Sequence, residues 1–296
     1  MALETLRRLL TGALLMALAQ ASLALPPYFA GTRQAAGDVK VQVEQVERKL
    51  QAEGLTVVGR HLPAGLPQHG SVIFTDRGLL DAVRSAGGVA IVGASLRVGV
   101  KSDGSVSYMN PEYWSRAYLR AGFDAAQPAV RALQERLAKA LGAGPGFGGD
   151  VPAADLAEYR YMFGMERLDS VRNELRSFAT FDEALRTVQD NLAKGVGATA
   201  KVYEVVLPQS RLAVIGVALN DAENGEAWWA GKIGPDHVAA LPYEIYIVEG
   251  KVSALYARYR IALSWPSLGM GQFMTIVRAP DAIHTTMGRL AGVAGP

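Results

Sequence analysis

Apolar residues recur at helical spacing in two widely separated parts of the chain. The first set, spaced by four, three and four residues, consists of Val39, Val43, Val46 and Leu50. The second set consists of Phe181, Ala184, Leu185, Val188 and Leu192. Such spacing places the apolar side chains on one face of a helix. A glycine follows each set, as is common where helices end, so the pattern predicts two matching amphipathic helices.

Runs of residues typical of β-strands follow each predicted helix. After the first helix they occupy 55–58, 71–75, 95–101 and 105–109, and after the second 200–206, 212–219, 242–248 and 251–263. In each half the last two runs are joined by a tight glycine turn, Asp103-Gly104 or Glu249-Gly250, which indicates a hairpin. The order helix, strand, strand, helix or loop, hairpin therefore occurs twice, and it predicts an ancient internal duplication.

A segment dense in glycine and proline separates the two halves and leaves little room for regular structure. We therefore predict a first repeat over 38–142, a linker over 143–154 and a second repeat over 155–293. Helical spacing also predicts a helix that ends near Leu141, a terminal helix after Pro280, and helical structure in the second half of 156–175. The expected fold class is α+β, with two related domains that are each an antiparallel sheet with helices packed on one face.

The amino terminus has the pattern of a secretory signal. Arg7 and Arg8 precede the apolar run 9–18, and Ser22-Leu23-Ala24 has the small-x-small form of a cleavage site. We expect residues 1–24 to be a signal peptide cleaved after Ala24, and the mature protein to be periplasmic. The alternative is an uncleaved membrane anchor, but the run is shorter than the roughly 20 residues that span a bilayer.

Composition narrows the class of protein further. The chain has 296 residues and no cysteine, which excludes disulfides and covalently attached haem. A hydrophobic content of 50% fits a packed globular protein. The net charge is +2, and it becomes +1 when Glu4, Arg7 and Arg8 leave with the signal. Because no basic patch stands out, we expect no nucleic-acid partner.

The second predicted hairpin resembles a known family. Residues 240–255 contain Leu241-Pro242, a strand, the Glu249-Gly250 turn and a following strand, and they resemble the family called domain of unknown function 302. Residues 95–100 and 104–111 look like the same element, closed by Asn110-Pro111. The resemblance implies a compact α+β domain in each half and no agreed activity. The first half lacks the leucine-proline pair, and the second has Ser264-Trp265-Pro266 in place of asparagine-proline.

No motif specifies a catalytic residue, a metal or a cofactor. The four histidines lie far apart in the sequence, so no metal site is predicted: His61, His69, His237 and His284. Non-covalent haem between His237 and Met270 or Met274 is chemically feasible, but methionines commonly fill gaps in a core, and we predict no cofactor. The serine-hydrolase pattern glycine-x-serine-x-glycine is absent, and the glycines of 144–149 are interpreted as linker.

Strand alternation over 251–263 predicts a polar sheet face that could bind an anionic ligand. Alternation directs Tyr256, Arg258 and Arg260 to one face, and Glu244 and Tyr246 on the partner strand to the same open side. Arginine forks and tyrosine hydroxyls suit a carboxylate, phosphate or sulfur oxyanion. The alternative is a solvated face on which Glu244 pairs with an arginine.

Paired tryptophans mark a second candidate surface. Trp228 and Trp229 lie in a segment that looks like a loop, where they could contact a partner or cap the core. Three functions are therefore open. The first is a soluble periplasmic binding or accessory protein with a site for a small anionic or amphipathic ligand, or for a partner protein, between its domains. The second is an enzyme that stabilises an anion with Arg258, Arg260 and a tyrosine, and the third is an interaction module that uses Trp228, Trp229 and Tyr113-Trp114.

Overall fold

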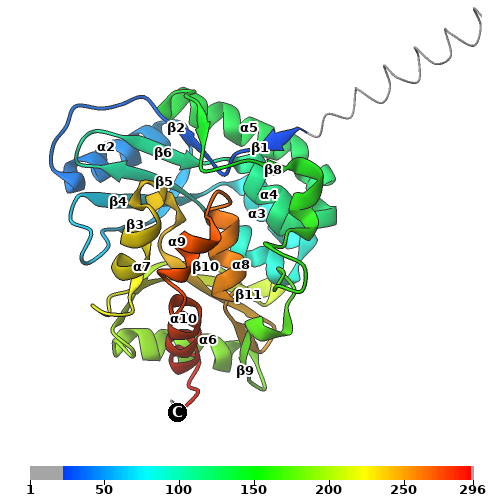
Figure 1. Ribbon diagram of the computed structural model, residues 1–296. Helices are drawn as coiled ribbons and strands as arrows, with labels where there is room; N and C mark the ends of the chain where they lie inside the picture. Colours follow the sequence, from blue (N-terminus) through cyan, green and yellow to red (C-terminus); the bar gives the residue numbers. More distant parts are fainter. Residues whose placement is uncertain (1–22, 295–296) are drawn as a thin grey trace, which may run out of the picture.

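The computed structural model describes residues 23–294, which contain two larger antiparallel sheets and one short strand pair (Figure 1). The six-stranded sheet has the order β3-β4-β5-β6-β2-β7 and the five-stranded sheet the order β10-β11-β12-β13-β9. The strands of the first sheet are β2 (Tyr28–Ala30), β3 (Thr56–His61), β4 (His69–Thr75), β5 (Leu96–Lys101), β6 (Val106–Met109) and β7 (Gly146–Phe147). Those of the second are β9 (Glu174–Ser177), β10 (Thr199–Leu207), β11 (Leu212–Leu219), β12 (Tyr243–Val248) and β13 (Lys251–Ser253). The short pair is β1 (Ala24–Leu25) with β8 (Val151–Pro152).

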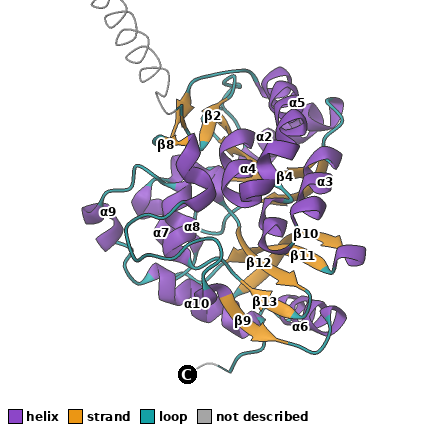
Figure 2. Cartoon of the chain, turned by 90° about the vertical axis from the view of Figure 1, so that its right-hand side faces the viewer, coloured by secondary structure: helices purple, strands orange, loops and turns teal. Residues whose placement is uncertain are grey.

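Helices surround both sheets (Figure 2). The α-helices are α2 (Val39–Ala52), α3 (Arg77–Ala86), α4 (Pro111–Leu119), α5 (Phe123–Leu141), α6 (Phe181–Ala193), α7 (Glu226–Ile233), α8 (Ala257–Ser264), α9 (Met270–Met274) and α10 (Ala279–Leu290). Two 3₁₀-helices, η1 (Gly88–Gly93) and η6 (Pro235–Ala240), precede the hairpins of the two halves. The predicted α+β class is confirmed, and the two amphipathic helices begin at Val39 and Phe181 as the apolar spacing predicts.

Both halves share one topology. The first half runs β2, α2, β3, β4, α3, η1, β5, β6, α4. The second runs β9, α6, β10, β11, α7, η6, β12, β13, α8, with one additional short 3₁₀-helix, Pro208–Ser210, between β10 and β11. The strand order β3-β4-β5-β6-β2 of the first sheet matches β10-β11-β12-β13-β9 of the second. The two predicted hairpins therefore occupy the same place in each sheet. A common topology is what a duplication would produce, and the duplication itself stays a prediction.

Each sheet is covered by its own helix on one face and by the other half on the opposite face. A Cβ atom on Gly70 of β4 would lie 2.9 Å from Val43 of α2, whereas a Cβ atom on Gly99 of β5 would lie 2.5 Å from Val238 of η6. Gly70 and Gly99 lie on opposite faces because Gly99 pairs with Ser71, the neighbour of Gly70. The second sheet is likewise contacted by a helix of its own half, α6, and by η1 of the first half. The halves thus cover each other reciprocally.

The segment predicted as a linker, 143–154, contains the two short strands β7 and β8, so the expectation of little regular structure there is wrong. β7 adds an edge strand to the first sheet by pairing with β2, and β8 pairs with β1. Glycine makes this pairing feasible, since a Cβ atom on Gly146 would overlap the ring of Pro26. The prediction of helix in the second half of 156–175 is also wrong. That segment is irregular apart from the 3₁₀-helices Ala153–Glu158 and Val171–Asn173 and the start of β9.

The predicted signal peptide lies outside the described residues except for its last two positions. Of these, Leu23 is exposed and Ala24 begins β1, which pairs with β8. Within residues 23–294, no helix combines the length and the apolar character needed to cross a membrane.

Candidate functional site

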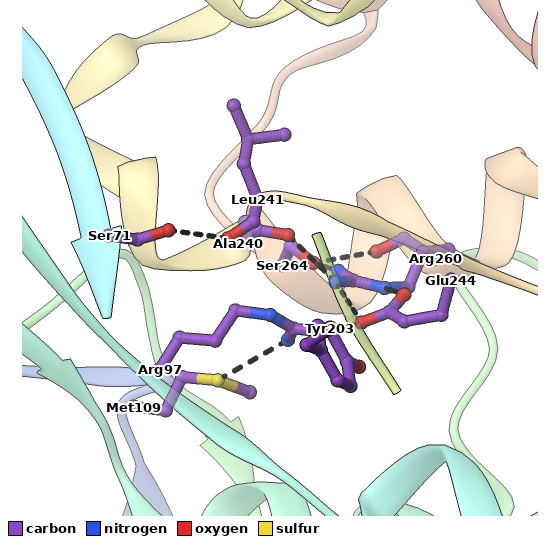
Figure 3. A network of polar contacts seen from close by, with 9 residues as sticks. All are labelled: Ser71, Arg97, Met109, Tyr203, Ala240, Leu241, Glu244, Arg260 and Ser264. Atoms are coloured by element: carbon purple, nitrogen blue, oxygen red, sulfur yellow. Dashed lines mark hydrogen bonds and ion pairs between the residues drawn. The ribbon is translucent and has the colours of Figure 1, made fainter. Parts of the chain in front are cut away.

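A buried ion network joins the two sheets at the boundary between the halves (Figure 3). Arg97 is the second residue of β5 and Glu244 the second residue of β12, and the Nη2 atom of Arg97 contacts the Oε1 atom of Glu244. Arg260 on α8 binds the same carboxylate, with its Nε atom 3.0 Å from Oε2 and its Nη2 atom 3.1 Å from Oε1. Arg97, Glu244 and Arg260 are 1%, 4% and 2% exposed. We call these three residues the central network.

The surroundings of the central network are polar and aromatic. Arg97 donates to the Tyr203 hydroxyl at 3.3 Å, and Arg260 donates to the carbonyl of Ala240 at 2.8 Å. The guanidinium of Arg260 lies 5.6 Å from the ring centroid of Trp114, within cation–π range. Burial raises the pKa of the neighbouring Tyr243, so this phenol stays neutral. Glu244 is the sole carboxylate of the described residues that pairs with either arginine, so the network carries one excess positive charge.

Equivalent positions of the two halves meet one another around the central network. Arg97 and Glu244 hold the same position in their strands, and Trp114 and Arg260 are both the fourth residue of their helices. Contact between equivalent positions is the mark of a two-fold interface. The contacts between the halves at Arg97 and Glu244, and at Trp114 and Arg260, thus follow the pattern of a two-fold interface.

Equivalent positions of the two halves also meet at the edge strands β3 and β10. Each strand has a bulge, and Gly59 and Tyr203 are the first paired residues after it. A Cβ atom on Gly59 would lie 2.7 Å from the Cβ atom of Tyr203, so these equivalent positions also meet. Glycine is required here because any side chain would separate the two edges.

The predicted polar sheet face does not exist, because residues 257–264 form the helix α8 and not the end of a strand. β13 ends at Ser253. Arg258 and Arg260 are two residues apart on a helix and so point in different directions. Arg260 enters the central network with Glu244, whereas Arg258 is 34% exposed at its side chain and lies 2.5 Å from Glu166. The structure thus brings together Glu244 and Arg260 but separates them from Arg258.

The two predicted tyrosines also lie apart from the central network. The Tyr256 hydroxyl donates to Asp281 at 2.7 Å, and its ring lies under the guanidinium of Arg172. Tyr246 is 5% exposed, and burial raises its pKa to about 12. The side of β12 that carries Glu244 and Tyr246 is buried, not open as predicted. Ligand binding by these five residues stays a prediction.

The paired tryptophans belong to the helix α7 and not to a loop. Trp229 is 2% exposed and packs edge-on against Trp265, with centroids 5.6 Å apart. Trp228 is half-buried. Tyr113 and Trp114, the other predicted contact points, are completely buried. Of these four aromatic residues, therefore, Trp228 alone reaches the surface to an extent that a partner could use.

A cleft lies where η6 of the second half meets β5 and β6 of the first. It has a volume of about 250 Å³ and is lined by Ala30, Gly99, Lys101, Ser105, Val106, Ser107, Phe147 and Asp236. We call it the inter-repeat cleft. The Lys101 Nζ atom donates to the Asp236 carboxylate at 2.7 Å, across the boundary between the halves. This hydrogen bond raises the pKa of Lys101, which is therefore cationic.

Two histidines adjoin the inter-repeat cleft. His69 pairs with Lys101 in the β4–β5 ladder, and its pKa is lowered by burial and by the charge of Lys101. His237 follows Asp236, contacts Phe147 edge-on at 5.6 Å and stacks on Trp265 at 5.2 Å. Burial lowers the pKa of His237 as well. Both rings are therefore neutral near pH 7, so the charge at the cleft comes from Lys101 and the carboxylates near it.

The remaining histidines supply no metal centre. His61 of β3 forms a buried pair with Glu226 of α7, with 2.6 Å between Nε2 and Oε1. His284 lies against the ring of Tyr256. Over residues 23–294, no group of three or more histidine, aspartate or glutamate side chains is arranged to hold a metal ion. Met270 and Met274, considered above as haem ligands opposite His237, are exposed on α9.

Comparison with family models and with curated proteins gives no match. The resemblance to the domain of unknown function 302 family therefore stays a prediction that rests on the hairpin residues.

Proposed function

We propose that this protein is a ligand-binding protein that holds a small carboxylate-bearing molecule in the inter-repeat cleft. The observation that carries the proposal is the position of Lys101, a cation whose main partner, Asp236, comes from the other half of the molecule. The side chain of Asp236 is 69% exposed, so water already competes for it. A ligand carboxylate can replace Asp236 as the partner of Lys101 without leaving a buried charge unpaired.

The other walls of the inter-repeat cleft suit a small ligand with an apolar body. Phe147 and Val106 supply apolar surface, and Ser105 and Ser107 supply hydroxyl groups that both donate and accept hydrogen bonds. Sites of this kind commonly combine apolar walls with a few fixed polar groups. A volume of about 250 Å³ is below the usual range for drug-sized molecules, which favours a small acid.

The sequence-based alternatives gain less support. An enzyme built on Arg258, Arg260 and a tyrosine would need these groups in one pocket, and α8 separates the two arginines. An interaction module built on the aromatic residues would need them exposed, and three of the four are buried. The proposed export rests on the amino-terminal pattern alone.

Thermal unfolding with a panel of small carboxylic acids tests the proposal, with the matching amides as neutral controls. A ligand at a hundred times its dissociation constant stabilises the folded state by about 2.7 kcal/mol. We expect at least one acid, and not its amide, to raise the melting temperature of the wild-type protein. Lys101→Met should abolish that shift, because it removes the cation that binds the carboxylate.

Lys251→Met is the matched control. Lys251 is also a lysine at a strand end that pairs with a carboxylate, Glu174 at 3.1 Å, but it lies outside the inter-repeat cleft. The control should keep the full shift. Equal shifts in all three proteins, or no shift with any acid, would contradict the proposal.

A further inference from the structure

Exposed apolar side chains gather on α9 and the turn that follows it. Met270, Met274 and Val277 are 48%, 56% and 48% exposed. Met270 and Met274 are four residues apart and lie on the same side of the helix. Figure 2 shows α9 at the outer edge of the molecule, beside α7. The turn thus presents apolar surface outward from the body of the protein.

A tryptophan held between two cations adjoins these apolar residues. The Lys232 Nζ atom lies 4.4 Å from the ring centroid of Trp228, and the Arg278 guanidinium lies 5.3 Å from it. Within residues 23–294, neither cation forms an ion pair with a carboxylate. Exposed basic residues elsewhere often have such a partner, as Arg211 has in Glu249. Lys232 and Arg278 are therefore available to an external anion.

Contacts between α7 and α9 join the tryptophan, its two cations and the exposed apolar residues into one continuous surface. Lys232 donates to the carbonyl of Thr275 at 3.4 Å, and Gln272 donates to the carbonyl of Ile233 at 3.2 Å. The tryptophan and its two cations are thus fixed beside the exposed methionines. We call the whole set the α7–α9 surface, which comprises Trp228, Lys232, Met270, Met274, Val277 and Arg278.

We propose that the α7–α9 surface docks the protein on an anionic lipid membrane. Methionine and valine side chains can enter the acyl boundary, tryptophan favours the level of the headgroups, and lysine and arginine bind lipid phosphates. Charge complementarity favours a lipid partner, because two cations without a carboxylate partner among residues 23–294 flank the apolar side chains, and the six residues of the α7–α9 surface include no acid. The proposal does not depend on ligand binding in the inter-repeat cleft.

Co-sedimentation of the full chain with lipid vesicles tests the proposal. We expect binding to vesicles of phosphatidylglycerol and phosphatidylcholine at low salt, and much weaker binding to phosphatidylcholine alone. Lys232→Gln with Arg278→Gln should weaken binding about 25-fold, since each cation near an anionic surface contributes roughly fivefold. Met270→Ser with Met274→Ser should weaken binding by removing the apolar contact.

Two matched controls separate docking from general attraction. Lys40→Gln with Lys194→Gln removes the same charge from exposed positions on other parts of the surface, and Val41→Ser with Val171→Ser removes exposed apolar groups elsewhere. Both controls should bind like the wild type. Equal losses in the charge control and the Lys232/Arg278 variant would overturn the proposal, as would absence of binding to anionic vesicles. Unchanged melting temperatures would show that each variant is folded.

Discussion

Glu244 lies between two guanidinium groups in a part of the molecule that water does not reach. Arg97 and Arg260 both depend on it, and the described residues offer them no other carboxylate. Removing one partner of a buried ion pair costs about 3–5 kcal/mol, because the remaining charge stays desolvated. We therefore predict that Glu244→Gln lowers the free energy of unfolding by about 3–5 kcal/mol, as measured by urea denaturation.

Glu174→Gln is the control for this change. Glu174 pairs with Lys251 at the surface, where an ion pair contributes at most about 1 kcal/mol. A loss of stability at Glu244→Gln no larger than that at Glu174→Gln would show that the central network does not hold the halves together.

The central network could be predicted only in part. The sequence pattern singles out Glu244 and Arg260, but it places them on an open sheet face. The reason is that residues 257–263 also alternate like a strand, whereas they form the helix α8. Arg97 is missed although it carries a signal, since it is the one charged residue in 96–100, before the terminal Lys101 of β5. Its position in β5 matches that of Glu244 in β12, so comparison of the two halves singles out both charged residues.

Gly99 determines how closely η6 approaches β5. A Cβ atom at this position would lie 2.5 Å from Val238 and 2.9 Å from the backbone nitrogen of Ala239, too close for either to remain in place. Overpacking of this kind costs about 1–3 kcal/mol. We predict that Gly99→Ala lowers the free energy of unfolding by that amount, measured by the same denaturation experiment.

Gly231→Ala in α7 provides the contrast. The nearest atom to a Cβ there is 4.0 Å away, and alanine is favoured over glycine in a helix by up to about 1 kcal/mol. This variant should be as stable as the wild type or more stable. If Gly99→Ala proved equally harmless, η6 would not be packed against β5 as described.

Helices could be predicted from the sequence where one face is buried and the other is exposed to solvent. α2 and α6 meet that condition, and their apolar spacing gives their starts correctly. α8 does not, because every residue of this helix except Arg258 is buried and no polar face remains to show the period. β7 and β8 were missed for a different reason, since their pairing depends on distant strands and not on local propensity.

At the scale of the whole molecule, both the central network and the inter-repeat cleft arise from the contact between the halves. Lys101 and Asp236 are 135 positions apart in the sequence, and neither half alone contains the cleft. The repeated order of patterns predicts two similar units, but it does not say which faces meet. That information lies in close approaches such as the one at Gly99, which no local pattern reveals.

Ligand binding in the inter-repeat cleft is most directly tested by native mass spectrometry of the protein after incubation with the acid that gives the largest thermal shift. Ser107 lines the cleft, and leucine at this position would fill the space that the ligand needs. Ser177→Leu on β9 places the same side chain at an exposed position outside the cleft. We predict one bound acid per chain in the wild type and in Ser177→Leu, and none in Ser107→Leu. Equal occupancy of all three proteins, or an empty wild-type protein, would contradict the account.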